Sequence, residues 1–108
     1  MAFRVEIEPQ AIEDLDSIAN FIKQKSSFTV AERWFNEVMH DIASLKNMPA
    51  RCPVAPEADG FGEEVRLLLH GRKHRTYKIY FAIHQETSST GTVRVFHVRH
   101  WARKEGLD

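Results

Sequence analysis

Apolar and polar residues alternate in four separate segments of this chain, a pattern that predicts four β-strands. The first segment is residues 3–7, FRVEI. The others are residues 64–70 (EVRLLLH), residues 76–84 (TYKIYFAIH) and a β-branched stretch, TVRVFHVRH, that starts at residue 92. Only short polar turns separate the last three segments, so we expect them to form an antiparallel meander.

Two helical segments stand between the first strand and the other three. After Pro9, which suits the first turn of a helix, apolar residues recur three and four positions apart as far as Ile22. A second stripe with this spacing opens at Thr29 and ends before Pro49. The short link at residues 26–27 makes the pair a helical hairpin, and each helix has one apolar stripe to bury.

The order strand, helix, helix, strand, strand, strand predicts an α+β fold, in which a curved antiparallel sheet has a helical hairpin packed on one face. Residues 49–63 contain three of the four prolines and two glycines, and this composition indicates a loop. The chain has 108 residues and no internal repeat, so we expect one domain over residues 1–108.

Composition favours a cytoplasmic protein that does not enter a membrane. No apolar run approaches the roughly 20 residues that span a bilayer, and the first residues, MAFRVEIEP, lack the apolar region of a signal peptide. Cys52 is the only cysteine, so an internal disulfide is impossible. A chain without disulfides fits a reducing compartment.

The two halves of the chain carry opposite charge, although the formal net charge is zero. Residues 1–64 hold 12 acidic and 6 basic side chains, a net of −6, and residues 65–108 hold 3 acidic and 9 basic ones, a net of +6. Five of the six histidines are also in the second half. The pattern indicates either two solvated surfaces of opposite sign or a basic face that meets phosphates or an acidic protein partner.

The last predicted strand mixes core residues with groups that bear chemistry. Strict alternation places its residues on two faces: Val93, Val95, His97 and Arg99 on one, and Arg94, Phe96, Val98 and His100 on the other. His97 and His100 then point in opposite directions, which excludes a metal site between them. No zinc, calcium or phosphate-loop motif occurs, so no cofactor is expected.

Several motifs together resemble the RelE/ParE superfamily, the toxins of type II toxin–antitoxin modules. The resemblance runs from FRVEIEPQAIEDLDSIANFI through HDIASLKNMP to the last strand. RCPVAPE followed by VRLLLHG and FHVRHWAR is similar to the subgroup of plasmid-stabilisation proteins. The resemblance implies the fold, growth arrest and a neutralising antitoxin. It leaves the target open, because the superfamily contains both ribosome-dependent ribonucleases and DNA gyrase inhibitors.

Candidate site residues follow from the ribonuclease branch. Cleaving RNA without a metal requires a general base, a general acid and cations that bind the charged phosphate. In related ribonuclease toxins, Arg and Lys on the central strands act with His or Tyr near the end of the last strand. This implies a catalytic set of Arg66, Lys78, Arg99 and His100, with Glu57, His97 and Arg103 as further candidates.

Structural roles remain open for three of these candidates, and Lys78 can instead be an ordinary solvated strand residue. Arg66 can instead pair with Glu57 or Glu64, and His97, between apolar neighbours, can instead be a hydrogen-bonded core residue.

Some features depart from the ribonuclease branch. Trp101 stands where a Tyr is often found, and the extra lysines of the RelE branch are missing. The long helical hairpin and short C-terminus look more like the ParE branch. We interpret the chain as a type II toxin, with cleavage of mRNA on the ribosome as the first hypothesis and non-catalytic inhibition of DNA gyrase as the alternative.

Overall fold

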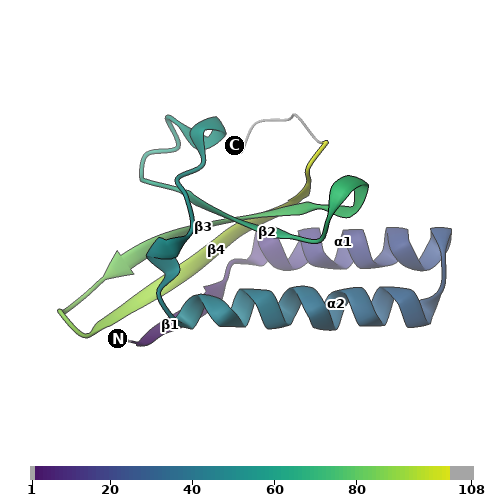
Figure 1. Cartoon of the computed structure of the whole chain (residues 1–108), viewed down its shortest axis with the longest axis horizontal. Helices are drawn as coiled ribbons and strands as arrows, with labels where there is room; N and C mark the ends of the chain where they lie inside the picture. Colours follow the sequence, from purple (N-terminus) through teal and green to yellow (C-terminus); the bar gives the residue numbers. More distant parts are fainter. Residues whose placement is uncertain (1, 103–108) are drawn as a thin grey trace.

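The computed structural model describes residues 2–102, and its elements follow the predicted order (Figure 1). They are β1 (Ala2–Ile7), α1 (Pro9–Lys25), α2 (Phe28–Ala43), β2 (Arg66–His70), β3 (Tyr77–Gln85) and β4 (Thr90–His100). Short 3-10 turns lie between them, including η3 (Pro56–Ala58) and η4 (Lys73–Arg75). The α+β class and the element order are thus confirmed. None of the helices in the described part of the chain is long and apolar enough to cross a membrane.

Helix α2 begins one residue before its predicted start. Ser27 has an extended backbone, and its hydroxyl accepts the backbone N–H of Val30 at 3.1 Å. A serine in this position satisfies one of the N–H groups that a helix leaves without an intrahelical partner. Ser27 is therefore the N-cap of α2.

The four strands form one sheet in the order β1-β4-β3-β2. Strands β2, β3 and β4 pair antiparallel, as the meander prediction requires. Strand β1 pairs with β4 in parallel, from Ala2 opposite Thr90 to Ile7 opposite Val95. A fully antiparallel sheet was therefore the wrong prediction for this pair. The chain between β1 and β4 contains both helices and two strands, and such a long connection permits a parallel pairing.

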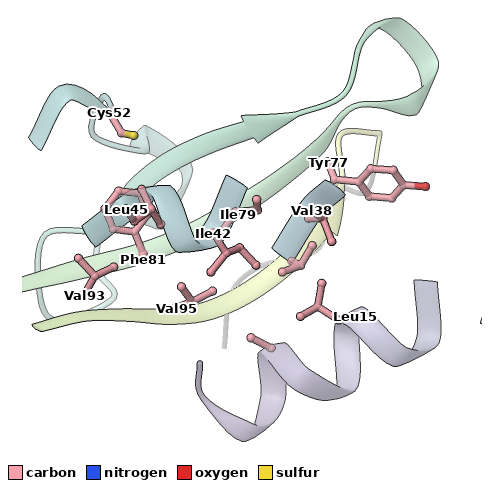
Figure 2. Close-up of a cluster of buried hydrophobic side chains, with 12 residues drawn as sticks. Leu15, Val38, Ile42, Leu45, Cys52, Tyr77, Ile79, Phe81, Val93 and Val95 are labelled. Carbon is pink, nitrogen blue, oxygen red and sulfur yellow. The ribbon is translucent and has the colours of Figure 1, made fainter. Parts of the chain in front are cut away.

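The main core lies between the helical hairpin and one face of the sheet (Figure 2). Leu15 of α1 and Ile42 of α2 are buried against strand residues such as Ile79, Phe81 and Val95. Both helices lie on the same side of the sheet (Figure 1). The prediction that the hairpin covers one face is therefore confirmed.

The loop of residues 49–63 covers part of the opposite face and creates a second, smaller core. Ala55 and Ala58 are buried in this core with Tyr80 and Phe96. Phe61 of the same loop places its ring 5.2 Å from that of Phe96. The proline-rich segment is thus a packed cover for part of this face, and within residues 2–102 Lys78 and Arg99 keep part of their surface exposed.

A β-bulge interrupts the pairing of β3 with β4. Tyr80 faces His97, whereas the next residue, Phe81, faces Val95. Phe96 is the extra residue on β4. One extra residue reverses the inward and outward alternation of everything that follows it.

The bulge corrects the predicted faces of β4. Val98 and His100 lie opposite Ile79 and Tyr77, on the face that the helices cover, and not on the face predicted for them. Residues 97 and 99 lie on the other face. His97 and His100 still occupy opposite faces, as predicted, but the histidine on the helix-covered side is His100.

Candidate functional site

The open part of the sheet carries a group of polar side chains that we call the open-face cluster: Glu57, Lys78, Tyr80, His97 and Arg99. Lys78 of β3 lies opposite Arg99 of β4, and Tyr80 lies opposite His97. Glu57 comes from turn η3, which the packed loop holds over this face. Four of the sequence-predicted candidates therefore meet here.

Glu57 connects the cluster to the loop. Its Oε2 atom lies 3.0 Å from Lys78 Nζ and accepts the Tyr80 hydroxyl at 2.8 Å. Its own backbone N–H lowers the pKa of the Glu57 carboxyl most, and the Tyr80 and Lys78 contacts lower that pKa further. Burial raises the pKa of Tyr80, and the Glu57 carboxylate raises it further. At neutral pH the two groups are a carboxylate and a phenol whose contacts hold η3 on the sheet.

His97 is an enclosed member of the cluster. Its Nδ1 atom is 3.4 Å from Asp14 Oδ2 of α1 and 3.4 Å from Arg99 Nη2. The side chains of His97 and Asp14 are only 9% and 11% exposed. A general base has to approach the proton it removes to about 3 Å. The burial of this imidazole favours the core role that the sequence left open.

Arg66 lies on the other face of the sheet, at the start of β2. Its Nη1 atom donates to the backbone carbonyl of Cys52 at 2.6 Å and to that of Ala50 at 3.3 Å. Its Nη2 atom lies 3.1 Å from Glu64 Oε1, so of the two pairings that the sequence left open, Arg66 makes the one with Glu64. These bonds attach the covering loop to the sheet.

His100 also lies on the helix-covered face. Its Nε2 atom is 2.6 Å from the carbonyl of His74, and its Nδ1 atom accepts the backbone N–H of Ala102 at 3.2 Å. A carbonyl can only accept, so Nε2 is the donor in the contact with His74. The ring meets Tyr77 edge-on at 5.4 Å. Both nitrogens of His100 are thus engaged.

The predicted catalytic set is therefore divided between two faces. Lys78 and Arg99 share the open face, whereas Arg66 and His100 lie on the side of the helices. Arg103 lies outside the described residues. Across residues 2–102, no three His, Cys, Asp or Glu side chains gather closely enough to hold a metal ion.

Sequence reasoning missed Tyr80 and Asp14 as members of this region. Tyr80 could have been found, because it alternates onto the same face of β3 as Lys78. Asp14 gave no such signal, since its position next to His97 depends on how α1 packs against β4.

Comparison with known proteins places the fold and the family. The sequence profile described as "ParE toxin of type II toxin-antitoxin system, parDE" matches residues 5–104. Among solved structures, a chain of the "Chromosomal ParDE TA system from P. aeruginosa" is similar, with a TM-score of 0.69 and 13% sequence identity, over 92% of this chain and 96% of that one. No curated protein sequence matches. The profile match covers nearly the whole chain, and the chain therefore belongs to the ParE toxin family of type II toxin–antitoxin systems.

Proposed function

We propose that this toxin arrests growth by binding its target, DNA gyrase, and not by cutting RNA. The observation that carries the proposal is the division of the candidate set between two faces of the sheet. A ribonuclease must bring its acid, its base and its phosphate-binding cations around one scissile bond. Arg66 and His100 cannot reach a phosphate that lies on Lys78 and Arg99, because the sheet stands between them.

The contacts of the remaining groups support the same reading. His97 and Tyr80 are 7% and 4% exposed, so neither can approach an RNA strand without a rearrangement of the face. Glu57 already accepts bonds from Lys78 and Tyr80. The open-face cluster is therefore better suited to shape a binding surface than to transfer protons.

A cognate antitoxin is the second partner in this proposal. Membership of the ParE family and similarity to a chain from a ParDE system both support it. The net charge of +6 in residues 65–108 gives an acidic antitoxin segment a complementary surface. Such a segment would order on the toxin as a helix or an added strand.

Cleavage of mRNA on the ribosome is the second candidate function, and one observation favours it. Lys78 and Arg99 are two cations that lie opposite each other on neighbouring strands, and His97 lies beside Arg99. Cations in this position can bind phosphate oxygens. Against it, His97 and Tyr80 are buried, and the carboxylate of Glu57 is already held by Lys78 and Tyr80.

One pair of assays separates the two functions. Purified toxin is tested for inhibition of DNA supercoiling by gyrase and for mRNA cleavage on translating ribosomes. Binding to gyrase predicts that supercoiling stops while the mRNA stays intact. His100→Ala should then weaken inhibition by a small, graded factor, similar to that of the exposed control His84→Ala.

The opposite result would be equally clear. Loss of a general acid or base lowers a rate by roughly a hundred- to ten-thousand-fold. If the wild-type toxin cuts mRNA, spares supercoiling and loses cleavage on that scale in His100→Ala, the gyrase proposal is wrong.

A further inference from the structure

A groove of about 820 Å³ separates the tip of the helical hairpin from the turn between β2 and β3. We call it the hairpin groove. One wall consists of the end of α1 and the start of α2, and the other of residues 70–75, which include η4. In Figure 1 the hairpin extends beyond the sheet on the side of this turn. The groove is separate from the open-face cluster, and its volume suits a ligand.

Cations line both walls of the hairpin groove. Lys25 and Arg33 lie on the helical wall, and Arg72 and Arg75 lie on the turn. Within residues 2–102, Glu37 is the only carboxylate that lines the groove, and it lies 3.9 Å from Arg33. Neither arginine of the turn pairs with a carboxylate of the described chain. Like charges that face each other repel, and an anion between them would relieve this repulsion.

The turn that presents the two arginines has a fixed backbone. Gly71 has a φ of 93°, and a Cβ atom there would lie 2.1 Å from the carbonyl oxygen of Arg75. Lys73 also has a positive φ, of 54°, and the N–H of Arg75 donates to the carbonyl of Arg72 at 3.0 Å. A tight turn of this kind holds its side-chain origins in place before a ligand arrives.

Aromatic rings lie beside these cations. Phe21 lines the groove and is 58% exposed, with Lys25 Nζ 5.9 Å from its ring centroid. Tyr77 and His100, in edge-on contact, line the groove as well. Phe21 is the exposed ring of the three, since Tyr77 is buried and His100 is half-buried. An exposed ring next to a cationic track is typical of proteins that bind single-stranded nucleic acid, because an unpaired base stacks on it.

We propose that the hairpin groove binds the sugar-phosphate backbone of single-stranded nucleic acid. The guanidinium groups of Arg72 and Arg75 contact phosphates from one wall, Lys25 contacts them from the other, and Phe21 stacks on a base. Guanidinium forks match phosphate oxygens, and an exposed ring adds an affinity that an acidic peptide would not use. This activity goes beyond the proposed function and does not depend on the toxin's target.

The test measures fluorescence anisotropy of a labelled single-stranded oligonucleotide with the full-length toxin, free of antitoxin, over a range of salt concentrations. Each phosphate contact contributes about 0.7 to the slope of log K against log salt. Arg72→Gln/Arg75→Gln should therefore lower the slope by about 1.4 and weaken binding about tenfold at low salt. Phe21→Ala should weaken it at least about fivefold.

Matched controls separate groove contacts from overall charge. Lys23→Gln/Lys46→Gln removes the same charge from residues that do not line the groove, and it should change the affinity by about twofold or less. Lys25→Gln tests the helical wall independently of the turn. Circular dichroism verifies that each variant is folded.

Two results would overturn the proposal. One is an oligonucleotide affinity that is the same in wild type and in both the turn and Lys25 variants. The other comes from competition for the labelled oligonucleotide. If an oligoglutamate peptide displaces it at a lower concentration than unlabelled oligonucleotide does, the groove binds an acidic protein segment instead.

Discussion

The carboxylate of Asp14 accepts the backbone N–H of Val98 at 3.0 Å and so joins the first helix to the last strand. Pairing with β1 ends at Val95, whose carbonyl accepts the N–H of Glu8 at 2.9 Å. Among residues 2–102, no strand pairs with this edge of β4 beyond that point, and Asp14 satisfies the N–H group of Val98 there. The same carboxylate also lies 3.4 Å from His97.

Removing this carboxylate should destabilise the fold. In Asp14→Ala, the Val98 N–H loses its partner and the His97 imidazole loses its contact with the carboxylate, both in nearly buried positions, which should lower the free energy of unfolding by about 2–3 kcal/mol. Asp16→Ala, an exposed change on the same helix, should stay within about 0.5 kcal/mol of wild type. Urea unfolding at pH 7 measures both, and equal losses would contradict the role of Asp14.

Glu57 should make stability depend on pH. Its pKa is lowered in the folded state from an ordinary value of 4.5, so its contribution is complete above that pH and disappears as the pH falls through the folded pKa. Its side chain is 37% exposed, and solvent screening limits the contribution to about 0.5–1 kcal/mol. Glu57→Gln should therefore be less stable than wild type at pH 7.

Urea midpoints at a series of pH values check this. The gap between wild type and Glu57→Gln should narrow as the pH falls below about 4.5. Glu13→Gln alters an exposed carboxylate of α1 and serves as the matched control. A gap that stays constant over this range would mean that Glu57 contributes through packing and not through its charge.

Arg66 should act on the covering loop and not on a substrate. Arg66→Ala removes its bonds to the carbonyls of Cys52 and Ala50, at a cost of about 1–3 kcal/mol. The loop should then open more often, so trypsin should cut after Arg51 faster than in wild type. Mass spectrometry of timed digests measures this rate, with Arg33→Ala as the control. If the rate of cleavage after Arg51 is unchanged in Arg66→Ala, Arg66 does not anchor the loop.

The antitoxin complex should weaken as salt is added. We expect an acidic antitoxin segment to cover the basic half of the chain. The dissociation constant of the toxin–antitoxin complex should then rise about tenfold between low and high salt, because screening reduces attraction between exposed charges. Arg99→Gln should weaken the complex, while Lys46→Gln should not. Titration calorimetry at several salt concentrations gives both values. An affinity that changes neither with salt concentration nor in Arg99→Gln would contradict the charged interface.

The sequence alone determined the elements and the faces of most of them. Apolar residues three and four positions apart placed Leu15 and Ile42 in the core, and simple alternation placed Ile79 and Phe81 there. These features depend on the periodicity of a helix or a strand, and this periodicity can be read from the order of apolar and polar residues. The resemblance to ribonuclease toxins identified Lys78 and Arg99 as candidates, whereas alternation alone would have placed Arg99 with Val93 and Val95 on the helix-covered face.

The tertiary structure alone decided how the segments meet. The parallel partner of β1, the bulge at Phe96 and the loop over the second face all depend on contacts between distant parts of the chain. Asp14 reaches Val98 across 84 positions and Glu57 reaches Tyr80 across 23. One extra residue in β4 sufficed to move His100 to the helix-covered face, since register is set by the pairing of whole strands and not by the alternation within one.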